Sequence, residues 1–201
     1  MIFYNENNKV INHKVIEHHE QFLADKLILE NDCVLELGAR YGTVSCTINN
    51  KLINKDKQVV IEPDDRVWEA LENNKKINNC NFNIVKGFLS NSKLDLTNTD
   101  DFGGYGTTFI ENNDTKISSY TMSDIKIKYN IDKFNVLVAD CEGFLEVFFN
   151  ENPTFYDDLR LIIFEADCPE KCNYEKIRYN LKIRNFRELL HGHQNAWIRD
   201  V

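Results

Sequence analysis

One short segment of this chain constrains its fold more than any other. Residues Val34 to Leu37 are apolar apart from Glu36, and they are followed by the turn Gly38-Ala39-Arg40-Tyr41-Gly42 and by residues that can begin a helix. Because glycine has no Cβ, such a turn lets a ligand lie against bare backbone at a helix N-terminus. A carboxylate in front of the turn suits a ligand with a cationic amine and hydroxyl groups better than it suits a phosphate.

Strand and helix patterns alternate along the rest of the chain. Short apolar runs predict strands, and apolar residues at helical spacing predict helices. The expected strands are 33–37, 58–62, 82–85, 135–139, 159–164, 186–190 and 196–198, and the expected helices are 14–29, 43–52, 67–78, 144–150 and 174–182, with a short helix near 123. This order predicts an α/β fold with a mostly parallel seven-stranded sheet, an antiparallel last strand and helices on both faces.

Residues 86–121 interrupt this alternation and are too many for a plain connection. They contain the run Gly103-Gly104-Tyr105-Gly106 and two short segments, 94–96 and 107–110, that can form a small antiparallel pair. We therefore expect one domain of residues 1–201, with a helical lead-in at 1–30 and a functional β insertion at 86–121, between the third and fourth strands.

Acidic residues end four of the expected strands: Glu36, Glu62, Asp140 and Glu165. The carboxyl ends of parallel strands meet at one edge of the sheet, where ligands bind in open α/β folds. Each acid taken alone can be a helix cap, but four acids on one rim predict a polar ligand site.

The charge and composition argue against some partners and compartments. The 201 residues carry a net charge of -8, whereas a broad nucleic-acid surface is normally basic. No apolar run approaches the roughly 18 residues of a membrane helix, and the first residues do not resemble a signal peptide. Most of the six cysteines stand singly beside apolar runs, as buried thiols do. We expect a cytoplasmic protein, in the host cytoplasm if the Asn-, Lys- and Ile-rich composition reflects a viral origin.

The order of these motifs resembles that of class I S-adenosylmethionine (SAM)-dependent methyltransferases. More narrowly, VLELGARYGTVS (34–45), VVIEPDD (59–65), VLVADCEGFLEVFF (136–149) and LIIFEAD (161–167) are similar to segments of FkbM-type enzymes. The run Asp140-Cys141-Glu142-Gly143 is the most family-specific part. The resemblance covers about residues 15 to 200 and implies a Rossmann-like methyltransferase fold. It departs at Arg40, where the family often has asparagine.

The resemblance implies a SAM site around the glycine turn. Glu36 would lie near the methionine end of SAM, and Glu62 would accept hydrogen bonds from both ribose hydroxyls, because a carboxylate offers two oxygens to two donors. Phe88 would lie near adenine, although it can equally be a core residue. The expected cofactor-binding residues are Glu36, Gly38, Ala39, Arg40, Tyr41, Gly42, Glu62, Pro63, Gly87 and Phe88.

The same resemblance implies methyl transfer to a hydroxyl group of a sugar, a glycan or a small metabolite. Asp140 is the first candidate for the acid beside the acceptor, as a base, an orienting group or a metal ligand, and Glu142, Glu165 and His193 follow. Asp140 with Glu165 could hold Mg²⁺, but a divalent metal is not expected. The run C-P-E-K-C at residues 168–172 has no second pair of cysteines and no nearby histidine to complete a metal site. His193 can equally be a polar residue of a turn.

Two other functions stay open at this point. An RNA or protein methyltransferase is the nearer alternative, although the D-C-E-G run at 140–143 disfavours methylation of nucleic-acid amino groups. A non-catalytic domain that binds SAM or a partner protein is the alternative of another class. The expected partners are therefore a small-molecule or glycan acceptor and no membrane; nucleic acid is disfavoured, and a homodimer is open.

Overall fold

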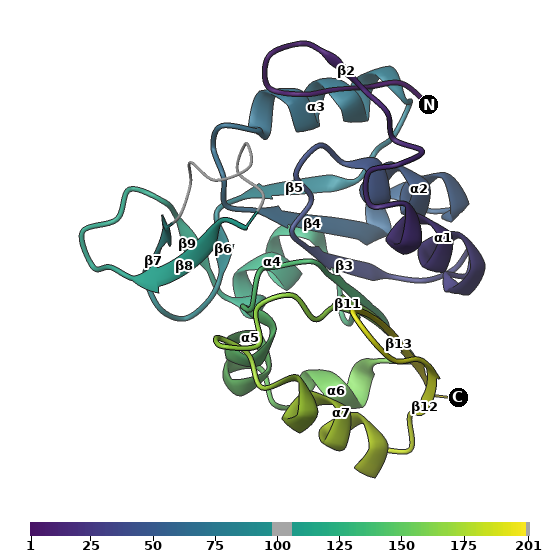
Figure 1. Cartoon of the computed structure of the whole chain (residues 1–201), viewed down its shortest axis with the longest axis vertical. Coiled ribbons are helices and arrows are strands. Elements are labelled where there is room, and N and C mark those ends of the chain that lie inside the picture. The colour runs from purple at the N-terminus through teal and green to yellow at the C-terminus, as the bar shows by residue number, and fades with distance from the viewer. Residues whose placement is uncertain (98–105, 200–201) are drawn as a thin grey trace.

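The centre of the protein is a seven-stranded sheet, as the sequence predicts. The structure, a computed structural model, describes residues 1–97 and 106–199. The sheet strands are β3 (Val34–Leu37), β4 (Gln58–Glu62), β5 (Asn83–Lys86), β10 (Val136–Ala139), β11 (Leu161–Glu165), β12 (Arg187–Leu190) and β13 (Gln194–Ile198). They lie in the order β12-β13-β11-β10-β3-β4-β5 (Figure 1). Strand β13 pairs antiparallel with β11 and β12, and the other pairs of this sheet are parallel.

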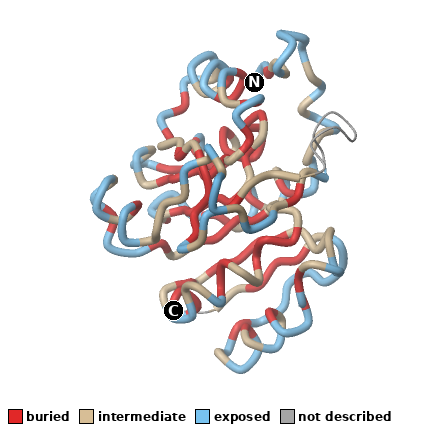
Figure 2. The backbone as a smooth tube through the Cα atoms, turned by 90° about the vertical axis from the view of Figure 1, so that its left-hand side faces the viewer, coloured by how far each residue is buried: buried red, intermediate tan, exposed pale blue. Residues whose placement is uncertain are grey.

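Helices cover both faces of the sheet, which explains why its central strands are apolar throughout. One face carries α1 (His18–Leu27), α2 (Thr43–Lys51) and α3 (Trp68–Ile77), with a 3-10 turn at Lys55–Lys57; the other carries α4 (Met122–Tyr129), α5 (Leu145–Glu151), α6 (Phe155–Asp158) and α7 (Tyr174–Ile183). Leu35 and Leu137 pack toward the α5 and α7 side, and Val34 and Val138 toward α1 and α2. The buried stretches therefore run through the middle of the molecule (Figure 2).

The strand order reverses at β3. This strand lies between β4 on one side and β10 on the other, so the chain leaves it in one direction and returns on the opposite side. In open α/β sheets a crevice forms at such a switch point, beyond the carboxyl ends of the two strands. The sequence places the glycine turn directly at this point.

The insertion between β5 and α4 forms two small sheets. Strands β7 (Leu94–Thr97) and β8 (Thr108–Glu111) pair antiparallel, which confirms the pair expected from the sequence. Strands β6 (Phe88–Leu89) and β9 (Ser119–Tyr120) pair in parallel, which was not predicted. Residues 103–105 of the Gly103-Gly104-Tyr105-Gly106 run lie outside the described residues.

The N-terminal segment differs from the helical lead-in expected at residues 1–30. It begins with the hairpin β1 (Phe3–Tyr4) and β2 (Val10–Ile11), and α1 starts only at His18. The hairpin is fixed to α3 because the side chain of Asn74 donates to the backbone oxygen of Tyr4 at 2.8 Å and accepts from its N–H at 2.9 Å. Among the described residues, no helix combines the length and apolar character needed to cross a membrane.

Candidate functional site

A cleft lies at the carboxyl ends of β3, β4 and β10, where the strand order reverses. It contains about 1000 Å³ of empty space, part of it open to solvent. Its walls come from the glycine turn, the ends of the three strands, the insertion strands β6, β7 and β8, and the first turn of α1.

The glycine turn is pressed against the end of β10. Gly38 has φ +81°, and a Cβ at this position would lie 1.7 Å from the backbone oxygen of Asp140. The N–H of Gly38 donates to the backbone oxygen of Ile61 at 3.0 Å. Only glycine fits here, because both the positive φ and the close approach exclude a side chain. The two strands can therefore present their ends to one small space.

Glu62 joins the end of β4 to the glycine turn. Its Oε2 atom accepts hydrogen bonds from the N–H groups of Ala39 at 3.1 Å and Arg40 at 2.7 Å, and its Oε1 accepts from the N–H of Asp64 at 2.8 Å. The side chain is buried, and burial raises the pKa of its carboxyl group although three N–H donors oppose this shift. A carboxylate has about four lone-pair positions, so Glu62 keeps acceptor capacity toward the cleft.

Glu36 lies beneath the turn and is 1% exposed. Its Oε1 accepts from the hydroxyl of Ser45 at 2.7 Å, and its Oε2 accepts from the side-chain amide of Gln58 at 2.9 Å. Burial nevertheless raises the pKa of Glu36 to about 8. The ligand-free protein therefore holds this carboxyl group mainly in its neutral form at pH 7, and a cation beside it would favour the charged form.

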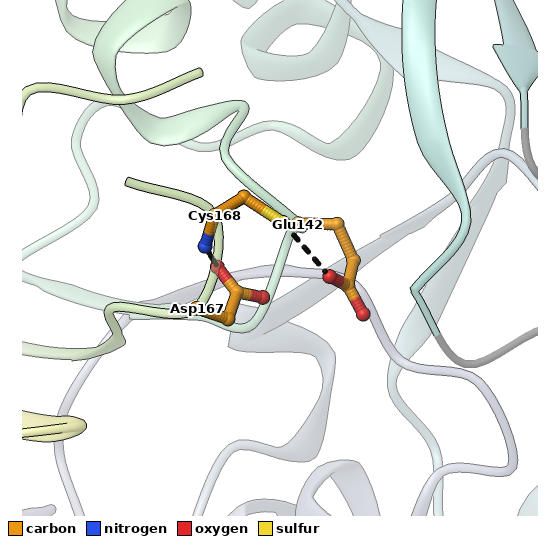
Figure 3. A group of neighbouring side chains, drawn as sticks. All are labelled: Glu142, Asp167 and Cys168. Atoms are coloured by element: carbon orange, nitrogen blue, oxygen red, sulfur yellow. Dashed lines mark hydrogen bonds between the residues drawn. The ribbon is translucent and has the colours of Figure 1, made fainter. Parts of the chain in front are cut away.

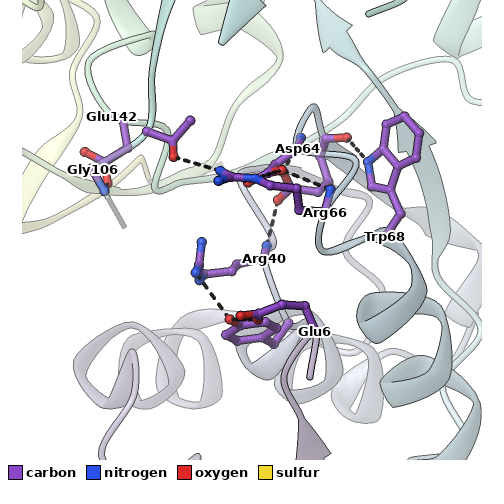
Figure 4. A network of polar contacts seen from close by, with 10 residues as sticks. Glu6, Arg40, Asp64, Arg66, Trp68, Gly106 and Glu142 are labelled. Carbon is purple, nitrogen blue, oxygen red and sulfur yellow. Dashed lines mark hydrogen bonds and ion pairs between the residues drawn. The ribbon is translucent and has the colours of Figure 1, made fainter. Parts of the chain in front are cut away.

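Arg40, the unusual residue of the turn, connects the cleft to the N-terminal segment. Its backbone has φ +45°, and its guanidinium lies 4.8 Å from the centre of the Tyr41 ring. Its Nη2 donates to the Tyr41 hydroxyl at 3.2 Å, and that hydroxyl donates to Glu6 (Figure 4). The Tyr41 hydroxyl and the Arg40 charge lower the pKa of Glu6. Arg40 thus ties residues 1–14 to the turn.

A second part of this network reaches the insertion. Arg66 binds Asp64 with its Nε at 2.8 Å and its Nη2 at 2.7 Å, and the same Nη2 donates to the Thr107 hydroxyl at 3.4 Å. The N–H of Gly106 donates to Oε1 of Glu142 at 2.8 Å (Figure 4). The start of β8 is therefore attached both to the end of β4 and to the loop after β10.

Carboxyl groups gather on the α1 side of the cleft. Glu20, Asp140 and Glu165 each offer an oxygen, and these atoms lie within 4.8 Å of one another. Glu17 lines the cleft next to them and accepts a hydrogen bond from the Thr43 hydroxyl. Burial raises the pKa of Glu17 to about 7 and raises the pKa values of Glu20 and Asp140 well above the ordinary range.

A second group of possible ligands, Glu142, Asp167 and Cys168, lies farther along the rim (Figure 3). The thiol of Cys168 donates to Oε2 of Glu142 at 3.3 Å, and Asp167 accepts from the N–H of Cys168 at 2.7 Å and from the Tyr174 hydroxyl at 2.8 Å. Burial raises the pKa of Cys168 to about 12 and that of Glu142 to about 6. The thiol is therefore protonated at neutral pH in the ligand-free protein, and a metal ion that bound there would have to displace this proton.

Most of the residues predicted from the sequence line the cleft: Glu36, Gly38, Ala39, Arg40, Glu62, Pro63, Phe88, Asp140 and Glu142. Phe88 also belongs to the main core, where its ring centre lies 6.3 Å from that of Phe144. It is 5% exposed, so little of its surface is open to the cleft.

Two predicted residues of the turn lie behind the cleft wall. Tyr41 directs its hydroxyl to Glu6 in the N-terminal segment. Gly42 begins α2 with φ +77°, and a Cβ there would lie 2.7 Å from the side chain of Leu71. Both residues shape the turn from its far side, and neither lines the cleft.

Three other predicted residues also lie outside the cleft lining. Gly87 lets the backbone at Ser118, near the end of the insertion, approach the end of β5, because a Cβ on Gly87 would lie 2.2 Å from the backbone oxygen of Ser118. Glu165 belongs to the carboxyl group cluster and contacts Nε2 of His193. The His193 side chain is 65% exposed in the turn before β13. It reaches the cleft region only through Glu165.

Sequence reasoning missed two acids near the start of α1, Glu17 and Glu20. Glu20 is 1% exposed, and Ala24 and Ile28, four and eight residues later, are buried as well. An acidic residue on the buried stripe of a helix is costly unless it is paired. The four-residue spacing of Glu20, Ala24 and Ile28 was the available signal. It identifies Glu20 as buried only when the face of α1 that packs on the sheet is already known.

Comparison with known proteins identifies the fold. No protein-family model matches the sequence, and no curated protein matches it. Solved structures do match. A precorrin-6y C5,15-methyltransferase from Geobacter metallireducens has a TM-score of 0.55 and 12% identity over 92% of this chain and 90% of its own. An O-methyltransferase from Bacillus cereus in complex with SAH has a TM-score of 0.53 and 12% identity over 94% and 84%.

A ribosomal protein L11 methylase from Lactobacillus delbrueckii has a TM-score of 0.50 and 14% identity over 93% of this chain and 78% of its own. At these identities the likeness concerns the fold alone. The chain therefore has the Rossmann-like α/β fold found in class I SAM-dependent methyltransferases, as predicted. The narrower FkbM-type assignment stays a prediction.

Proposed function

We propose that the protein is a SAM-dependent methyltransferase. The observation that carries this proposal is the placement of Glu62, whose carboxylate ends β4, touches the glycine turn and lines the cleft at the switch point. A carboxylate there meets the two adjacent hydroxyls of a ribose. The fold shared with methyltransferases supports the same assignment.

The donor chemistry of the cleft fits SAM. Glu62 would hold the ribose hydroxyls, and Glu36 would face the methionine ammonium, whose charge would favour the ionised form of this carboxyl group. The Gly38 turn would pass along the cofactor, and Phe88 would offer an apolar edge to adenine. When bound, SAM supplies a methyl group on a positively charged sulfur.

The chain's own part in the reaction is to hold the acceptor, exclude water and receive a proton. Asp140 lines the cleft beside Gly38 and is the carboxyl group that would contact the acceptor. Its pKa is raised by burial first, and then by the charges of Glu20 and Glu165. A positive charge beside Asp140 would favour its ionised form, which is the form that can accept the proton of a hydroxyl.

For the acceptor we propose a hydroxyl group of a sugar, a glycan or a small metabolite. Besides Glu36 and Glu62, the cleft is lined by the acids Glu17, Glu20, Asp64, Asp140 and Glu142. Carboxylates accept hydrogen bonds from hydroxyls but repel phosphates. This charge favours a neutral polyhydroxylated acceptor over RNA. A protein acceptor remains the competing possibility, which an acceptor assay decides.

The cofactor assignment is tested by thermal melting and calorimetry with SAM and SAH. Both ligands should raise the melting temperature of the wild type. Glu62→Gln should weaken SAM binding by about 10- to 100-fold, because one hydrogen bond to a charged group contributes about 1.5–3 kcal/mol. Glu30→Gln, the same change at an exposed residue, is the control. Absence of any shift with either ligand at millimolar concentration would overturn the proposal.

The acceptor assignment is tested with SAM that carries a labelled methyl group. Panels of sugars, small hydroxylated metabolites, RNA and protein would be compared with the wild type and Asp140→Asn. Label in a hydroxylated small molecule, lost in Asp140→Asn, is the expected result. Label found only in RNA or protein would overturn the acceptor class, and SAM binding with no transfer to any panel would support a non-catalytic domain.

A further inference from the structure

Three carboxyl groups meet at one side of the cleft although they come from three different elements. Glu20 lies on α1, Asp140 follows β10 and Glu165 ends β11. One oxygen of each lies within 4.8 Å of the others. Oxygen ligands at about 2.1 Å from a small divalent cation lie roughly 3–4 Å from one another. The three side chains therefore need to close by only a fraction of this distance to share one ion.

An unpaired buried oxygen is a second, independent sign of a missing partner. Glu20 is 1% exposed, and its Oε1 atom has no hydrogen-bond partner. Helix α1 packs on β11 and β13, and the next positions of its buried stripe are Ala24 and Ile28, so the side chain is held away from water. A buried polar oxygen without a partner costs about 1–3 kcal/mol. A ligand with positive charge would remove this cost.

The charges around this group have the same sign. Besides the three acids of the group, Glu17 lines the cleft next to them and Asp167 follows two residues after Glu165. His193 contacts Glu165 from the outer side. The repulsion among these carboxylates is relieved either by protons or by a cation.

We infer that the protein binds one divalent cation, Mg²⁺ or Mn²⁺, between the carboxylates of Glu20, Asp140 and Glu165. Carboxylate oxygens are the ligands that these ions prefer, whereas zinc and copper sites are richer in sulfur and nitrogen. The imidazole of His193 would hold Glu165 in place from behind, as neighbouring groups commonly do for metal ligands. Among the described residues, the other ligand group, Glu142 with Asp167 and Cys168, includes a thiol, which Mg²⁺ and Mn²⁺ do not favour as a ligand, so it is the weaker candidate for these ions.

The position of the ion gives it a role at the cleft. Glu20 and Asp140 both line the cleft, so the remaining coordination positions would face the empty space. A hydroxyl group that binds there would be oriented and would lose its proton more readily. This role rests on the proposed methyl transfer, but binding of the ion does not.

The test measures Mn²⁺ binding to the full chain without SAM, by the loss of the free-ion signal in electron paramagnetic resonance and by calorimetry. The wild type should bind one Mn²⁺ per chain, and Mg²⁺ should compete. Glu20→Gln and Asp140→Asn should each weaken binding by about tenfold or more. Glu30→Gln, an exposed acid just after the same helix, should bind as the wild type does.

Wild type that binds no Mn²⁺ at millimolar concentration would overturn the proposal, and so would equal binding by the wild type and both cluster variants. If one variant does not fold, the other variant and the wild-type titration still decide the matter. A parallel titration with SAH separates the two proposals. Binding of SAH without binding of Mn²⁺ would refute the cation site and leave the methyltransferase assignment intact. Binding of Mn²⁺ without binding of SAH would refute the methyltransferase assignment and leave the cation site intact.

Discussion

The buried carboxyl group of Glu36 should make the ligand-free protein less stable as the pH rises. Burial raises its pKa from 4.5 to about 8 in the folded chain. Between these values the unfolded chain has released the proton and the folded chain still holds it, so stability falls with increasing pH. Below pH 4.5 both states hold the proton, and above pH 8 both release it.

The size of this effect follows from the shift. Each pKa unit corresponds to about 1.4 kcal/mol, so Glu36 should remove about 3 to 4 kcal/mol of stability between pH 5 and pH 8. That is a large share of the roughly 5–15 kcal/mol by which domains are stable. Other buried acids, such as Glu17 with a pKa of about 7, add to the loss in the same direction. The contribution of Glu36 must therefore be isolated with a variant.

Glu36→Gln is the matched substitution. Its oxygen can still accept from the amide of Gln58, and its NH2 group takes the place of the O–H of the neutral acid beside Ser45, whose hydroxyl then accepts instead of donating. The buried Trp197 reports urea unfolding by fluorescence. The variant should lose about 3 to 4 kcal/mol less than the wild type between pH 5 and pH 8. Equal losses in the two proteins would show that Glu36 is already ionised in the folded chain and would refute the argument.

Two further substitutions test how the cleft and the sheet are held. Gly38→Ala should abolish the native fold or reduce the melting temperature strongly, because the new Cβ would lie 1.7 Å from a backbone oxygen. Gly106→Ala is the control, since Gly106 has a similar φ and a Cβ there would meet nothing within 4 Å. It should lower the free energy of unfolding by only about 1–2 kcal/mol. Asp32→Ala should cost about 3–5 kcal/mol in urea unfolding, because it leaves the largely buried guanidinium of Arg160 without its carboxylate. Asp25→Ala, at an exposed acid, should change stability by less than about 1 kcal/mol, and a similar loss in both aspartate variants would contradict this account.

The arrangement of the sheet could be predicted from local patterns. Apolar runs such as Val136–Ala139 and Leu161–Glu165 identify strands buried on both faces, and helical runs between them require parallel pairing. The pattern was less informative for short elements. The hairpin of β1 and β2, the parallel pair of β6 and β9, and α6 are two to four residues long per element and depend on contacts with distant parts of the chain.

The N-terminal helix shows where local reasoning reached its limit. Apolar spacing predicted a helix over 14–29, but Glu17 adopts φ +52° and α1 begins one residue later. This start lets Glu17 bind the hydroxyl of Thr43, across a separation of 26 residues. A contact of that kind leaves no mark in the residues next to it.

Strand direction and the conformational freedom of glycine are local properties, so the placement of acids at the ends of parallel strands beside a glycine turn could be predicted from the chain. The role of each acid depends on the folded arrangement. Glu62 is held by the N–H groups of Ala39 and Arg40, Glu36 is closed off beneath them, and Glu20 enters from α1 to meet Asp140. Their pKa values and partners depend on burial and on neighbours far away in the chain, and both exist only after the helices have packed onto the sheet.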